Sequence, residues 1–235
     1  MIKLPVSKNQ LVLEIGSGHS PHPRADILCD RFLINDQQRQ KRPLVIDRPL
    51  VIGIGERLPF KNKSFAFIYC AQVLEHSKKP LLFIKELSRV GKRGLMVMPS
   101  IVRERLFGWS YHRWYFWQKG KKLFGVKKNK KENHLLGKIT HSLFAKTLWF
   151  RRQVSEKERE LNIYYFWKNK PQLTVIAYSR QKIKEADKMV EKILEEMEFN
   201  WRKDLIFWFN WMWERVQGKR RKIIREMKNN FHKFL

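Results

Sequence analysis

Short apolar runs, separated by glycine, proline or polar residues, recur along the first half of the chain. An uninterrupted apolar run is typical of a strand buried on both faces of a parallel sheet. Residues 81–90 instead carry apolar side chains at helical spacing, which predicts a helix before the last strand of the series. The expected strands are residues 11–15, 26–29, 50–54, 65–70 and 95–98.

Two later runs, residues 161–167 and 173–178, are aromatic and β-branched, and a short polar linker ending in Pro171 separates them. This pattern predicts an antiparallel hairpin that closes the sheet. The connection between the first two strands contains Pro21 and Pro23 and is shorter than a helical crossover normally requires. We therefore expect a single helical turn there, or none.

The last quarter of the chain has a helical pattern. Residues 183–198 predict an amphipathic helix with apolar positions at Ile183, Ala186, Met189, Val190, Ile193 and Met197. After them, residues 205–213 are dominated by tryptophan, phenylalanine and aliphatic side chains and are too few to span a bilayer. A helix continued from residue 205 would present one face with Leu205, Trp208, Phe209, Met212, Trp213, Val216, Ile223, Met227 and Phe234. Its opposite face would carry Arg215, Arg221, Lys222, Arg225, Lys228 and Lys233, with Phe207 and Trp211 among them.

Such a tail fits the surface of a membrane. An interfacial helix places aromatic rings at headgroup depth and directs basic side chains toward anionic lipid. Two alternatives remain open: a helix docked on its own chain, and a contact between two copies of the chain.

Composition limits the architecture. With 235 residues, of which 43% are hydrophobic, the chain suits one α/β domain with an appendage. Cys29 and Cys70 fall at the ends of expected strands without metal-ligand spacing, so we expect reduced, structural thiols. His19 and His22 share a loop without a third ligand at a recognisable spacing, so no metal site is expected. The amino-terminal segment lacks a signal-peptide pattern and no run is long enough to cross a bilayer, which favours a cytoplasmic protein with association to a membrane surface.

The charge is the most unusual part of the composition. Fifty lysines and arginines stand against 22 acids, which gives a formal net charge of +28. Residues 101–138 contain eleven basic and two acidic side chains, and residues 199–235 contain ten and three. An excess of this size predicts a polyanionic partner, for which nucleic acid and an anionic membrane both qualify.

The clearest chemical motif follows the first expected strand. Gly16-Ser17-Gly18 allows backbone N–H groups to approach a ligand closely, and Asp30 at the tip of the next strand can accept hydrogen bonds from a ribose. Ser20 replaces the third glycine of the dinucleotide fingerprint and no helix-length stretch follows. A nucleotide without a clamped pyrophosphate is therefore the expected ligand.

Further blocks occur in a fixed order after this motif. They read GERLPF at 55–60, SFAFIYC at 64–70, VLEH at 73–76 and GLMVMPS at 94–100. Together with LEIGSG they resemble the class I S-adenosylmethionine-dependent methyltransferases, over roughly the first hundred residues. Residues 105–109 and 112–115 also resemble a bacterial subgroup of this family.

The resemblance implies a fold and a division of the chain. The fold would be α/β, a Rossmann-like doubly wound and mostly parallel sheet with a closing antiparallel hairpin, plus a helical carboxyl-terminal extension. Residues 1–180 would form the methyltransferase domain, in which the basic and aromatic insertion 101–152 would cover the substrate pocket. Residues 181–235 would form the amphipathic basic tail.

The resemblance also implies S-adenosylmethionine as cofactor and a set of site residues. The implied cofactor-binding residues are Glu14, Gly16, Ser17, Gly18, Asp30, Ile54, Gly55, Glu56 and Ala71. His76 and His112 are placed like bases that could remove a proton from an oxygen or nitrogen acceptor, although either could have a purely structural role. Ile54 and Ala66 stand where relatives carry acids. The missing hydrogen bond to adenine is worth about 0.5–1.5 kcal/mol, so cofactor binding would be weakened without being abolished.

The expected function is methyl transfer to an acceptor that the sequence does not identify. A lipid-linked or cell-envelope glycan intermediate fits the tail and the aromatic insertion. An RNA methyltransferase is the alternative that the charge suits, although a second RNA-binding module is absent from the sequence and Ser100 stands where an N-P-P-[YF] motif would lie. A non-catalytic, methyltransferase-like membrane adaptor is the third hypothesis.

Overall fold

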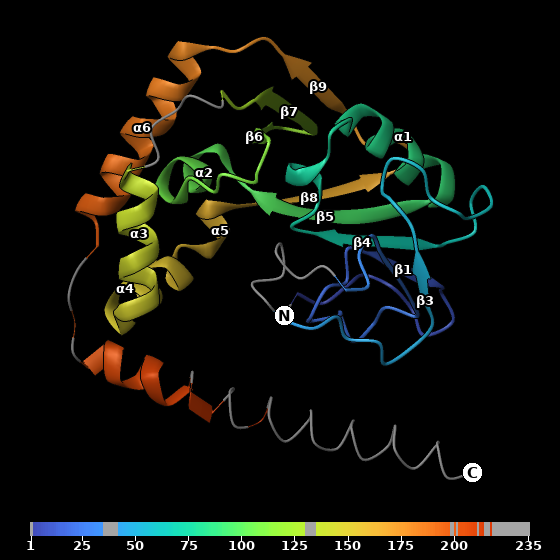
Figure 1. Cartoon of the computed structure of the whole chain (residues 1–235), viewed down its shortest axis with the longest axis horizontal. Coiled ribbons are helices and arrows are strands. Elements are labelled where there is room, and N and C mark those ends of the chain that lie inside the picture. The colour runs from blue at the N-terminus through green and yellow to red at the C-terminus, as the bar shows by residue number, and fades with distance from the viewer. Residues whose placement is uncertain are drawn as a thin grey trace.

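A computed structural model of the chain describes residues 2–34, 42–129, 135–197, 200, 202–210, 212–213 and 217. A sheet, covered on one face by a helix and a smaller sheet, adjoins a group of helices at one end (Figure 1). The larger sheet contains six strands in the order β3-β2-β1-β4-β5-β8. These strands are β1 (Val12–Ile15), β2 (Ile27–Asp30), β3 (Leu50–Ile52), β4 (Phe67–Ala71), β5 (Arg93–Pro99) and β8 (Asn162–Lys168).

The first five of these strands are parallel, and β8 runs antiparallel to β5. This order is that of a doubly wound sheet, so the expected Rossmann-like α/β fold is confirmed. Each predicted strand is present within a few residues of its expected bounds, because both faces of a parallel strand must be apolar. β3 ends at Ile52, two residues earlier than the apolar pattern indicated.

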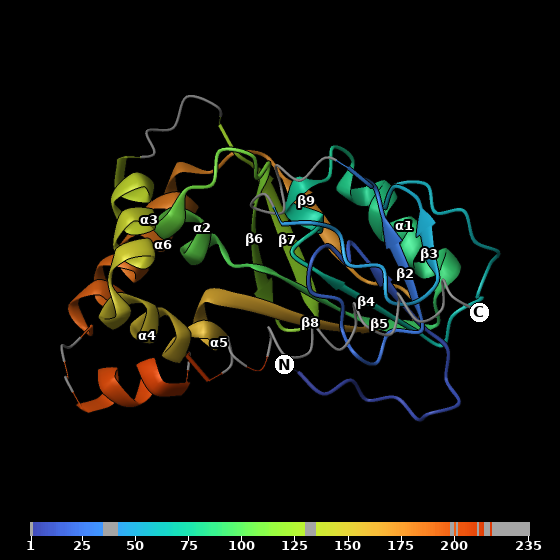
Figure 2. The same cartoon turned by 60° about the horizontal axis from the view of Figure 1, so that its bottom comes forward.

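One face of the sheet carries α1 (Pro80–Val90), the predicted helix, which follows the short 3₁₀ helix η2 (Leu74–His76). Phe83, Ile84 and Leu87 of α1 are buried in the main core. Next to α1 lies a second sheet, in the order β6-β7-β9, formed by β6 (Trp114–Lys119), β7 (Lys122–Lys127) and β9 (Leu173–Ile176) (Figure 2). Trp114, Phe116 and Leu123 of this second sheet belong to the same core cluster as α1.

The predicted hairpin of residues 161–167 and 173–178 is wrong in its pairing. The first run is β8 and closes the large sheet, as expected, but β9 runs parallel to β7 instead of pairing with β8. The linker is held by a side chain: the Tyr165 hydroxyl accepts a hydrogen bond from Gln172 N–H at 2.9 Å and lies 2.9 Å from the carbonyl oxygen of Lys121. This hydroxyl places β9 beside the edge of the β6–β7 hairpin, which the sequence pattern did not reveal.

The opposite face of the large sheet is covered by the amino-terminal segment. Leu4 is buried in one cluster with Val12, Phe67, Leu95 and Val97. Residues 16–26, which connect β1 to β2, contain no helix, so the prediction drawn from Pro21 and Pro23 is confirmed.

The group of helices comprises α2 (Ile101–Phe107), α3 (Leu135–Lys146), α4 (Leu148–Glu156), α5 (Glu158–Leu161) and α6 (Arg180–Glu195). The predicted amphipathic helix is α6, whose Ile183, Ala186, Val190 and Ile193 are buried in a cluster with residues of α2. Met189 lies outside this buried face and is 54% exposed. The expected tail therefore begins with a helix that shares a core with the insertion.

A last described helix spans residues 202–210. The carboxylate of Asp204 pairs with Arg152 of α4 at 2.6 Å, while Ile206 and Phe209 are 63% and 54% exposed. The expected basic face from Arg215 to Lys233, and Trp211, lie outside the described residues. In the part of the chain that the structure describes, no helix is long and apolar enough to cross a bilayer.

Candidate active site

A cavity of about 710 Å³ opens beyond the carboxyl ends of β1, β2 and β4. Its walls come from residues 14–20, from residues 29–32, and from the loops that follow β3 and β4. Residues 110–113 and 127–129 of the insertion complete it. The glycine loop and the aromatic insertion, distant in sequence, therefore share one cavity.

The glycine loop has a conformation that requires glycine. Gly16 has φ +71°, and a Cβ at this position would lie 2.3 Å from Cγ2 of Val73. Its N–H donates to the carbonyl oxygen of Cys29 at 2.7 Å, and the N–H of Gly18 donates to Oδ2 of Asp30 at 3.0 Å. Ser17 Oγ is buried in the loop without a hydrogen-bond partner among the described residues. The loop thus offers the cavity an unused hydroxyl and closely approaching backbone.

Two of the three acids expected at the cofactor, Glu14 and Asp30, lie at this loop. Asp30 also accepts a hydrogen bond from Phe32 N–H at 3.1 Å through Oδ1. The Glu14 carboxylate accepts a hydrogen bond from His22 N–H at 2.7 Å. It therefore holds the end of the loop at His22 rather than the glycines. Burial raises the pKa of Glu14 to about 7.

The remaining predicted cofactor residues follow β3 and β4. Gly55, Glu56 and Ala71 line the cavity, and Glu56 Oε1 accepts from Ser77 Oγ at 2.7 Å. Ile54 is not among the described residues that line the cavity and is 39% exposed. Because β3 ends at Ile52, Gly53 takes the lining position that the sequence pattern assigned to Ile54.

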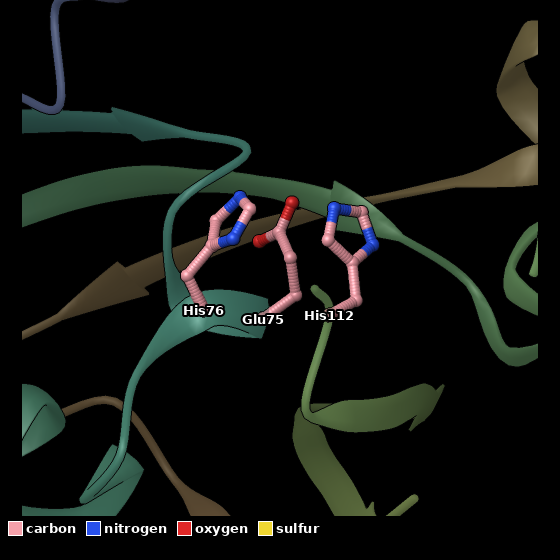
Figure 3. A group of neighbouring side chains, drawn as sticks. All are labelled: Glu75, His76 and His112. Atoms are coloured by element: carbon pink, nitrogen blue, oxygen red, sulfur yellow. The ribbon is translucent and has the colours of Figure 1, made fainter. Parts of the chain in front are cut away.

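The structure brings the two predicted bases together. The imidazole rings of His76, at the end of η2, and His112, between α2 and β6, are edge to face with centroids 4.7 Å apart. Figure 3 shows the carboxylate of Glu75 between these rings. Two hydrogen bonds join the segments: Arg113 N–H donates to the Glu75 carbonyl oxygen at 2.8 Å, and Trp114 Nε1–H donates to the Ser77 carbonyl oxygen at 2.8 Å.

Three charged residues that sequence reasoning did not assign to the site surround His112. Glu104 of α2 lies 2.6 Å from His112 Nδ1 through Oε2 and 2.5 Å from Lys128 Nζ through Oε1. Glu75 is fully buried, and neither carboxylate oxygen has a hydrogen-bond partner in the described residues. Glu104 carries a sequence signal, since it is one of only two acids in the strongly basic segment 101–138.

Burial shifts the protonation of this group. It raises the pKa of Glu75 to about 8, and it lowers the pKa of His76 to about 3, with a smaller contribution from His112. The His76 imidazole is therefore neutral at physiological pH and resists protonation.

Comparison with known proteins supports the resemblance. Residues 28–98 match the family model described as "Methyltransferase domain". An uncharacterized protein of Methanocaldococcus jannaschii, MJ1123, is 38% identical over 63 residues, which cover 26% of this chain and 31% of that protein. The chain thus matches about a third of the length of this curated relative.

Two solved structures are similar to part of the chain. The YcgJ protein of Bacillus subtilis is 24% identical, with a TM-score of 0.34 over 41% of this chain and 47% of its own. A SAM-dependent methyltransferase of Thermotoga maritima, titled a possible histamine N-methyltransferase, is 16% identical, with a TM-score of 0.32 over 79% of this chain and 63% of its own. The resemblance to the class I methyltransferases is confirmed, and the family model places it within residues 28–98.

Proposed function

We propose that the chain transfers a methyl group from S-adenosylmethionine to an acceptor held under the insertion. The observation that carries this proposal is the shared cavity, in which the glycine loop and Asp30 lie at one side and His76 and His112 at another. The methyltransferase family match includes Asp30 and His76, so it covers residues from both sides.

The residues present fit this cofactor. Ser17 lines the cavity and its Oγ lacks a partner in the described residues, and the glycine at position 16 keeps the loop backbone clear of the Val73 side chain. Asp30 would hold the ribose hydroxyls, while the backbone of Gly53, Gly55 and Glu56 would face the adenine. When bound, the cofactor supplies an already activated methyl group, so the protein's task is alignment and proton removal.

The acceptor side would be formed by the two imidazoles and by Tyr111, whose ring stacks on His76 with centroids 5.6 Å apart. Aromatic walls exclude water and hold an acceptor in line with the transferred methyl group. Burial lowers the pKa of His76 to about 3 and makes that imidazole a weak base. His112, whose ring is held by Glu104, would therefore accept the proton that an oxygen or nitrogen acceptor loses.

Calorimetry with S-adenosylhomocysteine, the demethylated product, tests the cofactor site. Ser17→Ala should weaken binding by a factor of a few up to about ten, because one hydrogen bond is lost, and should leave the melting temperature unchanged. Ser88→Ala is the matched control, since Ser88 lies on α1 and its hydroxyl donates, among the described residues, to carbonyl oxygens of that helix. Absence of binding at millimolar ligand would contradict the proposal.

The proposed location is an anionic membrane surface, with a lipid-linked or cell-envelope glycan intermediate as the acceptor. Support comes from the net charge of +28 and from the exposed apolar side chains of residues 205–213 that the structure describes, namely Leu205, Ile206, Phe209, Met212 and Trp213. Several basic side chains near anionic lipid contribute about 1 kcal/mol each, and the buried apolar side chains add to this.

Flotation with vesicles of anionic and neutral lipid tests this location. Phe209→Glu should reduce flotation, whereas Met189→Glu should not, although both side chains are 54% exposed. Binding that survives moderate salt fits lipid, because apolar contacts are insensitive to screening. Retention of RNA that falls steeply with salt, without flotation, would favour RNA methylation instead.

A further inference from the structure

Glu75, His76 and His112 form a compact group at the insertion side of the cavity (Figure 3). One ligand atom from each residue, a carboxylate oxygen and two imidazole nitrogens, lies within 4.8 Å of the others. We propose that these three residues bind one divalent transition-metal ion.

The donor set suits such an ion. Two histidines and one glutamate form the three protein ligands of many catalytic zinc sites, which keep a further position open. The same two imidazoles and one carboxylate also suit other first-row divalent ions. Zinc bonds of roughly 2.0–2.1 Å require donor atoms roughly 3.4 Å apart, so side-chain rotations that bring the atoms up to about 1.4 Å closer would complete the site.

Burial supplies an independent argument from Glu75. The side chain is fully buried and both of its oxygens lack a hydrogen-bond partner in the described residues. A buried carboxyl without partners is energetically costly, and proteins normally satisfy it with a donor or a cation. Arg103 is buried and its charge acts on Glu75, but no ion pair joins the two among the described residues. A metal ion would satisfy the carboxylate that Arg103 leaves unpaired.

The surroundings of His112 are those of a metal ligand. Its Nδ1 is bonded to Glu104 at 2.6 Å, which fixes the ring and leaves Nε2 for another partner. Glu104 is itself held by Lys128, whose Nζ also donates to the Trp109 carbonyl oxygen at 2.8 Å. A carboxylate behind a ligating imidazole orients the ring and raises its basicity, and this arrangement accompanies most histidine ligands.

The position of the group indicates what the ion would do. His76 and His112 line the cavity that also contains the glycine loop, so the open side of the ion would face the acceptor. This step rests on the proposed function, but the proton acceptor differs: an imidazole nitrogen bound to the ion has no lone pair left for a proton, so water takes it. A hydroxyl acceptor that coordinates the ion loses its proton to water more readily; its oxygen then forms the new bond to the methyl carbon as the carbon–sulfur bond breaks. The inferred substrate class is therefore an acceptor that bears a hydroxyl group.

Metal binding by the full chain is the test. Protein stripped with a chelator and returned to metal-free buffer is titrated with Zn²⁺ by calorimetry, and bound zinc is counted by elemental analysis after dialysis. We expect one ion per chain. Glu75→Gln, His76→Ala and His112→Ala should each reduce the bound zinc to background.

His141→Ala is the matched control. His141 contacts the same Trp109 ring as His112, at a centroid distance of 5.5 Å, but does not belong to the group. It should keep full zinc binding. Glu75→Gln preserves size and removes no hydrogen bond, and circular dichroism should show that it folds. Absence of stoichiometric zinc, or zinc binding that Glu75→Gln and His112→Ala leave unchanged, would overturn the proposal.

Calorimetry with S-adenosylhomocysteine on the same stripped sample separates this inference from the proposed function. Zinc binding without nucleoside binding supports the metal site and contradicts the cofactor site. Nucleoside binding without zinc binding supports the cofactor site and contradicts the metal site.

Discussion

Truncation of the chain at two positions tests how α6 contributes to the fold. A chain that ends at Arg180 lacks α6, and a chain that ends at Met197 retains it. Ile183, Val190 and Ile193 are buried against the α2 cluster, and each contributes roughly 1.5–3 kcal/mol. Their joint loss, roughly 5–9 kcal/mol, is comparable to the whole free energy of unfolding of a typical domain, about 5–15 kcal/mol. The shorter chain should therefore lose the packing of its helices.

Urea and thermal melts, followed by tryptophan fluorescence and circular dichroism, measure this effect. The chain that ends at Met197 should melt close to the full-length protein, and the chain that ends at Arg180 should melt far lower or aggregate. The charge pattern alone predicts an accessory tail, so the chain that ends at Arg180 would keep its stability. The burial of α6 predicts that this chain loses it. Equal melting of both truncated chains would refute the argument from α6 burial.

Three substitutions test other contacts. Gly16→Ala places a Cβ 2.3 Å from Val73 at a position with left-handed backbone. The affinity for S-adenosylhomocysteine, measured by calorimetry, should therefore fall more than about tenfold. Unchanged affinity would exclude a ligand on this loop. Glu14 has a folded pKa of about 7 against 4.5, so its stabilising contribution is complete below pH 4.5 and is lost as the pH rises through 7. Glu14→Gln should lack this decline of about 3 kcal/mol in urea melts, and an unchanged pH slope would contradict the buried carboxyl. Glu104→Gln leaves Lys128 without its ionic partner and should lower the free energy of unfolding by about 3–5 kcal/mol. Adding Lys128→Met should restore part of this free energy. No recovery in the double variant would argue against the Glu104–Lys128 ion pair.

The fold could be predicted where burial alone determines the residue types. β1 and β5 are buried on both faces and appear as continuous apolar runs, and α1 shows the helical spacing of one buried face. The strand that pairs with β9 could not be predicted, because β7 and β8 have similar compositions and either is a suitable neighbour. The Tyr165 hydroxyl holds the linker, and its position depends on the completed sheet.

The candidate site was predictable in part for the same reason. Gly16 and Asp30 are local to one strand–loop–strand segment, and they lie in one cavity as the motif indicated. His76 and His112 were identified separately, and only the folded insertion brings their rings to 4.7 Å. The pairing of Glu104 with His112 depends on the angle between α2 and the following loop, which no spacing in the sequence records.

The amino-terminal segment has a consequence for the order of folding. Leu4 belongs to a cluster with Leu95 and Val97, about 90 residues further along the chain, and Tyr164 of β8 packs against the same cluster. During synthesis, residues 2–6 leave the ribosome long before their docking surface exists, so one face of the growing sheet stays exposed until β5 and β8 are made. Contacts of such sequence separation form late and slow the folding of a domain. Residues 2–6 are thus synthesised before the surface on which they dock, and closure of that face marks the completion of the sheet.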